Sequence, residues 1–109
     1  MDAGGGDDLE IPVSQYMSDW QSAPHVLLDV REQEEWDAGH AAAARLIPLG
    51  DLDARLGELD PMRPIAVICR SGRRSLMAAE YLKDRGFANP VSVAGGMIAW
   101  QEAGHPVVL

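Results

Sequence analysis

The chain has 109 residues, a length that suits one hydrophobic core, and 47% of its residues are hydrophobic. Its formal net charge of −8 argues against non-specific nucleic-acid binding, which needs basic surface to displace counterions. A single cysteine cannot form an internal disulfide, and the three histidines lack the spacing of metal ligands. We therefore expect no metal and no cofactor.

The start of the chain lacks the pattern of a signal peptide, and no apolar stretch approaches the length of a membrane span. We expect a disordered tail over the glycine- and aspartate-rich residues 1–9 and one domain over residues 10–109. A cytoplasmic monomer is expected, because the sequence demands neither an oxidising compartment nor a second subunit.

Hydrophobic periodicity, prolines and glycines predict strands that alternate with helices. In chain order we expect strand 11–13, helix 14–20 capped by Ser14, strand 25–30, helix 32–38 ended by Gly39, strand 46–48 ended by Pro48, helix 51–59, strand 65–68, helix 75–85 ended by Gly86, strand 91–93 and helix 97–103. Such alternation suits parallel crossovers. The predicted fold is therefore α/β: a small three-layer domain with a central, mostly parallel sheet of four or five strands flanked by helices.

The cysteine, Cys69, follows the predicted strand 65–68 and precedes a helix, in the segment Cys69-Arg70-Ser71-Gly72-Arg73-Arg74-Ser75. At such a junction, backbone N–H groups and the helix dipole converge on an anion, and a thiolate is an anion. Three arginines with no acidic residue among them add positive potential, which favours a nucleophilic thiolate. A lone cysteine without this loop would instead be interpreted as an inert buried side chain.

Each residue of this loop has an expected role. Gly72 supplies positive φ, so that the backbone N–H groups of the loop turn toward the sulfur as an anion-binding nest. Ser75 is expected to cap the following helix. Arg73 and Arg74 have the geometry to hold an oxyanion, whereas Arg70 is as well suited to solvent as to substrate.

Asp29 and Arg31 follow another predicted central strand and so share the sheet edge of Cys69. They either orient the cysteine loop or form a structural ion pair, and we expect the ion pair. The surrounding acidic run is interpreted as a solvated helix face. The remaining conspicuous side chains are expected to serve the architecture, with packing by Trp20, Trp36, Trp100, Met77 and Met97 and a turn fastened by His40.

Short motifs follow one another over about residues 10–107: Leu28-Asp29-Val30-Arg31-Glu32, Trp36 with Gly39-His40, Ile47-Pro48, the segment from Cys69 to Ser75, and Gly95-Gly96-Met97-Ile98-Ala99-Trp100 followed by Gly104-His105-Pro106. In this order they resemble the rhodanese family, specifically its single-domain sulfurtransferases. The chain departs from the family at Ala43 and Leu46, where glycine and asparagine are usual. These departures concern the backbone after His40 and not the cysteine loop.

The resemblance implies that Cys69 takes a sulfane sulfur from an anionic donor such as thiosulfate, forms a persulfide, and passes the sulfur to a thiophilic acceptor (cyanide or a thiol, including a protein thiol). The residues agree with this chemistry independently. A thiolate that is already formed needs no general base, and no histidine lies beside Cys69 in the sequence. One site for both transfers predicts ping-pong kinetics.

Two other functions remain open. A cysteine phosphatase or arsenate reductase on the same scaffold uses a longer Cys-x5-Arg loop, whereas this loop is Cys-x4-Arg and Ser75 stands where the longer motif needs arginine. A sulfur-carrier or redox-sensing module, loaded by a protein donor, would keep Cys69 but turn over small donors poorly. A non-catalytic scaffold is disfavoured by the intact cysteine and its arginines.

Overall fold

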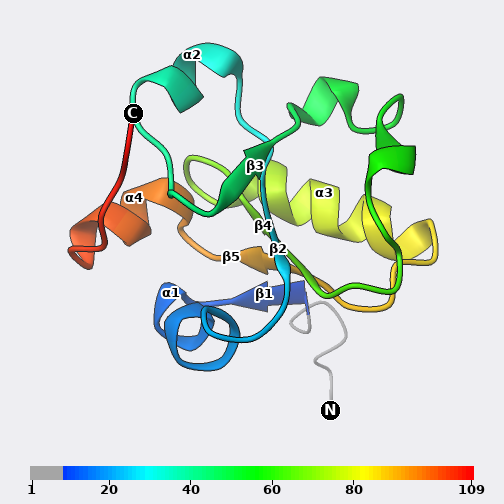
Figure 1. Cartoon of the computed structure of the whole chain (residues 1–109), viewed down its shortest axis with the longest axis horizontal. Helices are drawn as coiled ribbons and strands as arrows, with labels where there is room; N and C mark the ends of the chain where they lie inside the picture. Colours follow the sequence, from blue (N-terminus) through cyan, green and yellow to red (C-terminus); the bar gives the residue numbers. More distant parts are fainter. Residues whose placement is uncertain (1–8) are drawn as a thin grey trace.

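The computed structural model describes residues 9–109 (Figure 1). The tail predicted over residues 1–9 falls outside the described residues apart from Leu9, which is buried. The elements in chain order are β1 (Glu10–Ile11), α1 (Val13–Gln15), η2 (Tyr16–Trp20), β2 (Val26–Asp29), α2 (Gln33–Asp37), β3 (Ala44–Leu46), η3 (Leu49–Asp51), η4 (Leu56–Glu58), β4 (Ile65–Ile68), α3 (Arg73–Asp84), β5 (Pro90–Val93) and α4 (Gly96–Glu102).

The strands form one five-stranded sheet in the order β1-β5-β4-β2-β3, and every neighbouring pair is parallel. Asp29, the last residue of β2, is in register with Ile68, the last residue of β4. The segments that follow these two strands, which carry Arg31 and Cys69, therefore leave the sheet at the same edge. The prediction of a parallel α/β sheet with four or five strands is confirmed.

Alternate residues of the central strands point to opposite faces of the sheet, and each face has its own core. On one face Leu27 and Ile68 pack with α1, η2 and α4, through Val13, Tyr16, Met97 and Trp100. On the other face Leu28 and Val67 pack with α3 and the η3–η4 segment, through Leu52, Leu59, Ala78 and Leu82. Figure 1 shows α1 and η2 on one side of the strands and α3 on the opposite side. The predicted three-layer arrangement is confirmed.

Several predicted boundaries were wrong. The helix predicted over 14–20 begins at Val13 after Pro12 and continues as the wider turn η2, so Ser14 is not its cap. The predicted helix 51–59 consists of the short 3₁₀ turns η3 and η4, because Gly50 and Gly57 weaken an α-helix. The third strand is Ala44–Leu46 and not 46–48, since Pro48 has no N–H to donate to the ladder.

The predictions for the architectural side chains were correct with one exception. Trp100 and Met97 are buried, Trp20 packs against the core, and Trp36 stacks on the His40 ring with centroids 3.6 Å apart. Nδ1–H of His40 donates to the Trp36 carbonyl at 3.0 Å, which fastens the turn after α2. Met77 is 59% exposed, so its predicted packing was wrong. No helix among the described residues is long and apolar enough to cross a membrane.

Candidate active site

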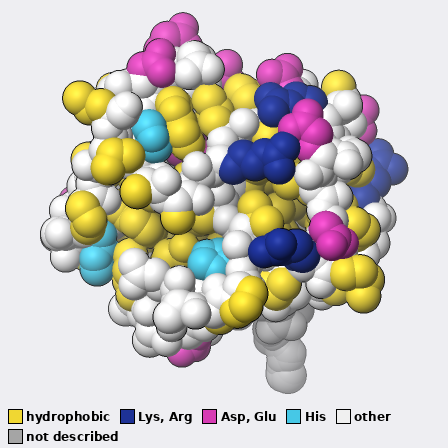
Figure 2. Space-filling view, viewed as in Figure 1, with side chains coloured by type: hydrophobic (Ala, Val, Ile, Leu, Met, Phe, Trp, Pro, Cys, Tyr) yellow, Lys and Arg dark blue, Asp and Glu magenta, His cyan; other side chains and the backbone are white. Residues whose placement is uncertain are grey.

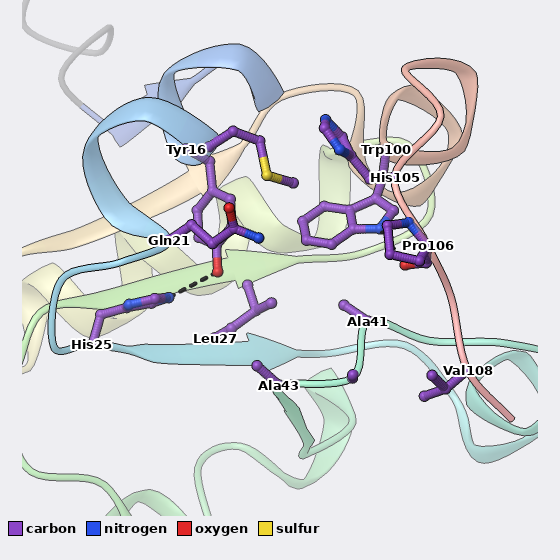
Figure 3. Close-up of a pocket in the computed structure, with 12 residues that line it drawn as sticks. Tyr16, Gln21, His25, Leu27, Ala41, Ala43, Trp100, His105, Pro106 and Val108 are labelled. Atoms are coloured by element: carbon purple, nitrogen blue, oxygen red, sulfur yellow. Dashed lines mark hydrogen bonds between the residues drawn. The ribbon is translucent and has the colours of Figure 1, made fainter.

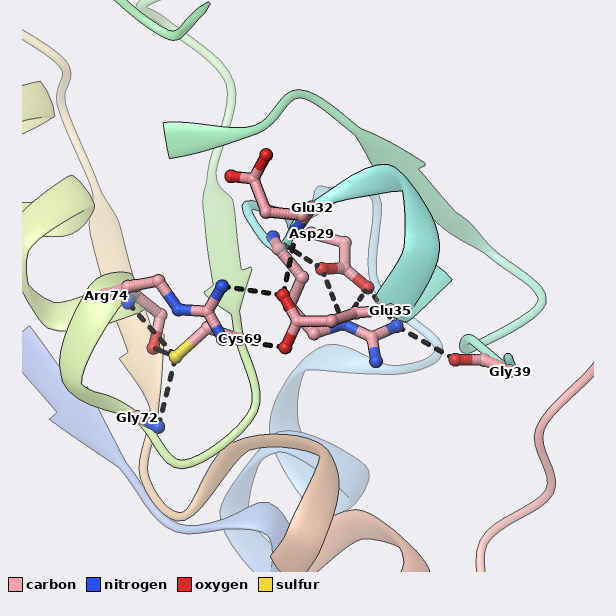
Figure 4. Close-up of polar contacts among 9 residues, drawn as sticks. Asp29, Glu32, Glu35, Gly39, Cys69, Gly72 and Arg74 are labelled. Atoms are coloured by element: carbon pink, nitrogen blue, oxygen red, sulfur yellow. Dashed lines mark hydrogen bonds and ion pairs between the residues drawn. The ribbon is translucent and has the colours of Figure 1, made fainter. Parts of the chain in front are cut away.

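Cys69 directly follows β4, and its sulfur lies inside the turn that leads to α3 (Figure 4). The backbone N–H groups of Gly72 and Ser75 donate to Sγ at 3.1 and 3.3 Å. The Ser75 hydroxyl oxygen lies 3.4 Å from Sγ. The prediction that backbone N–H groups of the loop turn toward the sulfur is confirmed.

Gly72 makes this inward turn possible. Its φ of 102° lies in the left-handed region that side-chain-bearing residues rarely adopt. Gly72 is also the residue that precedes the first turn of α3, and its carbonyl accepts from the Leu76 N–H at 3.1 Å. The helix thus begins at Arg73, two residues earlier than predicted, and the prediction that Ser75 caps it was wrong. Ser75 instead lies in the first turn, where its N–H is free to bind the sulfur.

The environment of Cys69 favours the thiolate. Burial by itself acts to raise the pKa of the thiol, since Cys69 is 1% exposed. Hydrogen bonds from the Ser75 hydroxyl and from the N–H groups of Ser75, Gly72 and Ser71 outweigh this and hold the pKa below its ordinary value. These hydrogen bonds therefore make the thiolate of Cys69 more accessible than that of an ordinary cysteine.

The Ser75 hydroxyl is itself hydrogen-bonded to a second hydroxyl, that of Ser92. Ser92, in β5, is fully buried, and its Oγ lies 2.7 Å from Oγ of Ser75. When Ser75 donates its proton to a thiolate, its oxygen can accept the proton of Ser92. Ser92 was predicted only as part of a strand. The one signal for it in the sequence is a hydroxyl between two valines of a buried strand.

Backbone hydrogen bonds from the start of α4 brace the cysteine loop. The Met97 N–H donates to the Cys69 carbonyl at 2.8 Å, and the Ile98 N–H donates to the Arg70 carbonyl at 3.1 Å. These bonds turn two loop carbonyls away from the sulfur while the N–H groups of Gly72 and Ser75 face it. Gly96 permits the close approach, because a Cβ there would lie 2.3 Å from the Cys69 carbonyl oxygen. The sequence predicted only a turn at Gly95-Gly96.

Asp29 and Arg31 form a buried ion pair, as expected. The Arg31 Nη2 donates to Oδ2 of Asp29 at 2.8 Å, and Nε donates to Oδ1 at 3.0 Å. A further bond of 2.9 Å runs from Nη2 to the Gly39 carbonyl at the end of α2. The pair therefore ties the segment after β2 to the turn after α2, and its guanidinium is engaged by these partners.

The three loop arginines have different surroundings. Arg74 forms a two-point ion pair with Glu35 of α2, with Nη1–Oε1 at 2.7 Å and Nη2–Oε2 at 2.9 Å. Arg70 and Arg73 are exposed, and within residues 9–109 neither side chain makes an ion pair or hydrogen bond. Glu35 was not predicted as a site residue. Its only signal is its place three residues after Glu32, in the capping box at the start of α2.

A cleft of about 350 Å³ opens beside the loop, between α2 and α4. Charged, polar and apolar side chains line it, among them Arg31, Glu35, Arg70, Met97, Ile98 and Gln101. Figure 2 shows basic and acidic side chains close together on one part of the surface, next to exposed hydrophobic ones. Such a mixture suits a small anion or a polar thiol better than an apolar ligand.

A second hollow, of about 200 Å³, is apolar and lies elsewhere (Figure 3). Its walls include Tyr16, Leu27 and Trp100, and the Tyr16 hydroxyl is hydrogen-bonded to Nε2 of His25 at 2.8 Å. No residue from 69 to 75 lines it, so it is separate from the chemistry of the cysteine loop. Among the described residues no cluster of histidine, cysteine, aspartate and glutamate could hold a metal ion.

The fold agrees with the comparison to known proteins. The model of the Rhodanese-like domain matches residues 13–103, and the chain belongs to that family. Among solved structures, a rhodanese-related protein from Thermoplasma volcanium is 36% identical, with a TM-score of 0.83 over 92% of this chain and 97% of that one. A rhodanese-like domain protein from Staphylococcus aureus is 30% identical, with a TM-score of 0.80 over 92% and 98%.

The curated relatives carry related names. A protein named "Sulfurtransferase" from Allochromatium vinosum is 32% identical over 96 residues, which are 88% of each chain. "Putative sulfurtransferase YtwF" from Bacillus subtilis is 41% identical over 73% of this chain and 77% of its own length. "Putative sulfur carrier protein YrkF", also from Bacillus subtilis, is 45% identical over 68% of this chain. The chain therefore spans less than half of the length of that relative, since the match covers 40% of it.

Proposed function

We propose that the protein is a sulfurtransferase that moves a sulfane sulfur from thiosulfate, or a similar anionic donor, to a cyanide or thiol acceptor through a persulfide on Cys69. The observation that carries the proposal is the placement of Sγ inside a turn whose N–H groups donate to it at 3.1 and 3.3 Å. A site with these donors holds negative charge on a sulfur that is almost fully removed from water.

In the first transfer the Cys69 thiolate attacks the outer sulfur of thiosulfate. An S–S bond forms between Sγ and that sulfur, the bond between the outer sulfur and the sulfonate breaks, and sulfite leaves with the electron pair. In the second transfer cyanide or an acceptor thiolate attacks the outer sulfur of the persulfide, and the Cys69 thiolate is regenerated with the electron pair. Electrons balance without an added oxidant, and neither transfer requires a metal or a general base.

The residues of the loop have separate tasks in this scheme. The N–H groups of Gly72 and Ser75 and the Ser75 hydroxyl hold the charge on Sγ before attack and after the sulfur has left. Arg70 lies at the cleft, where its exposed guanidinium can meet the sulfonate of the donor. An acceptor thiol, on a small molecule or on a protein, would enter through the same cleft, which gives ping-pong kinetics.

Steady-state turnover of thiosulfate and cyanide to thiocyanate tests the proposal. The wild-type protein is expected to turn over, and Cys69→Ser is expected to lose all activity while it keeps its unfolding temperature. Aryl phosphate hydrolysis is the matching test of the phosphatase alternative, and we expect none, because the Cys-x4-Arg loop lacks the arginine of the longer motif. Phosphate release that depends on Cys69 would overturn the assignment to sulfur chemistry.

The name of the YrkF relative is the reason to keep the sulfur-carrier alternative in view. A carrier would accept sulfur from a persulfide on another protein and would show little thiocyanate formation from thiosulfate. A free cysteine at the centre of the site fits a reducing compartment, and we propose a cytoplasmic monomer. Sedimentation of the purified protein tests the monomeric state.

A further inference from the structure

The ion pair between Arg74 and Glu35 joins the cysteine loop to a helix that lies 39 residues earlier in the chain. Figure 4 shows the Arg74 side chain extended from the first turn of α3 toward the Glu35 carboxylate. Both terminal nitrogens of the guanidinium are used, at 2.7 and 2.9 Å, so the carboxylate occupies the end-on face of Arg74. An arginine held in this way is not free to bind a sulfonate by the same two-point contact.

Glu35 is itself fixed in place. Its Oε1 accepts the N–H of Glu32 at 2.9 Å within the capping box of α2. The hydrogen bonds from Arg74, assisted by that N–H, hold the pKa of Glu35 at about 2 against the opposing effect of burial. The carboxylate therefore stays ionised across the whole neutral range, where it offsets the charge of Arg74.

The arginines around the cleft differ in whether they have an ion-pair partner. Arg31 lines the cleft, but its guanidinium is bound to Asp29 and to the Gly39 carbonyl. Glu35 lines the cleft as well, as the partner of Arg74. Arg70 is the remaining arginine of the lining, and within residues 9–109 its side chain has no ion-pair partner.

We propose that Glu35 is a specificity-determining residue: by holding Arg74 it leaves Arg70 as the cation that meets the donor, and it limits the affinity of the site for doubly charged donors. The inference rests on the proposed sulfur transfer. The expected consequence is that the site discriminates between sulfur donors by their charge. Thiosulfate carries two negative charges, whereas a thiosulfonate such as benzenethiosulfonate presents the same sulfane sulfur with one.

The test is the KM of Glu35→Gln for these two donors, with cyanide as acceptor. Release of Arg74 is expected to lower the KM for thiosulfate about fivefold and that for benzenethiosulfonate less than about twofold. Glu34→Gln is the matched control, because it removes the same charge from the same helix at an exposed position and is expected to change neither KM. The double variant Glu35→Gln with Arg74→Ala is expected to lose the gain, since the released arginine is then absent.

Arg70→Ala provides an independent arm, and it is expected to raise the KM for thiosulfate about tenfold. The proposal is overturned if Glu35→Gln raises or preserves the KM for thiosulfate, if Glu34→Gln has the same effect, or if Arg70→Ala leaves the KM unchanged. A lower unfolding temperature together with lower activity in Glu35→Gln would also overturn the proposal, because it would assign Glu35 a purely structural role. Absence of turnover in the wild type would instead contradict the proposed function itself.

Discussion

The bracing of the cysteine loop by α4 predicts that Gly96→Ala is among the most damaging small substitutions in the chain. The new Cβ would lie 2.3 Å from the Cys69 carbonyl oxygen and 2.6 Å from that of Arg70, and contacts under 3.0 Å are essentially never seen. Both obstacles are backbone atoms, so no side chain can rotate away. The loop or the start of α4 must move, and the hydrogen bonds from the Met97 and Ile98 N–H groups are then strained.

The expected loss of stability is the sum of two costs. Alanine in left-handed geometry, with φ of 56° at this position, costs about 1–2 kcal/mol. Overpacking adds about 1–3 kcal/mol, so the free energy of unfolding is expected to fall by about 2–5 kcal/mol. In a domain of this size about 1 kcal/mol shifts the unfolding temperature by about 4 °C, and the expected shift is about 8–20 °C.

Gly86→Ala is the matched control, because Gly86 has φ of 90° and no atom within 4 Å of the added Cβ. Strain alone therefore predicts a loss of about 1–2 kcal/mol there, and a φ of 90° is less favourable to alanine than one of 56°. The assay is thermal unfolding, with the rate of persulfide formation measured below both transitions. We expect Gly96→Ala to lose more stability and also to slow persulfide formation, whereas Gly86→Ala retains its rate. Equal losses of stability and an unchanged rate in Gly96→Ala would refute the bracing role of α4.

Two further predictions concern the thiolate and the buried ion pair. Alkylation of Cys69 by iodoacetamide is expected to reach half its maximal rate at a pH below the ordinary thiol pKa. Ser75→Ala is expected to move that midpoint to higher pH, because a hydrogen bond that lowers the pKa of Cys69 is lost. A midpoint that does not move in Ser75→Ala would contradict this role of the hydroxyl. Asp29→Asn leaves the Arg31 charge buried and is expected to cost about 3–5 kcal/mol in urea unfolding. Glu58→Gln, which breaks exposed ion pairs with Arg45 and Arg55, is the control and is expected to destabilise the protein far less. Equal losses of stability in the two variants would refute the structural role of Asp29.

The features that local sequence determines were predicted well. The strand Ile65–Ile68 has the predicted bounds, because four consecutive apolar residues between Pro64 and Cys69 suit a strand that is buried on both faces. The positive φ of Gly72 and the inward N–H groups follow from the tight connection between that strand and α3. The ion pair of Asp29 and Arg31 is likewise local, since the two residues are two positions apart.

What the sequence could not predict depends on residues brought together by the fold. The partner of Arg74 is Glu35, and the hydroxyl behind Ser75 belongs to Ser92; in both cases parallel crossovers bring distant segments to one edge of the sheet. The bracing of the loop by Met97 is equally non-local, because a backbone N–H has no signature in the sequence. The 3₁₀ turns after β3 were mistaken for a helix because buried leucines at helical spacing outweighed Gly57 in the pattern.

The central claim is that Cys69 carries a persulfide. The most direct measurement is the intact mass of the protein after incubation with thiosulfate and removal of the excess. We expect the mass of one added sulfur atom, its disappearance on treatment with cyanide or dithiothreitol, and no addition to a folded Cys69→Ala variant. Folded wild-type protein that gains no mass from thiosulfate, or a gain that persists in Cys69→Ala, would contradict the account.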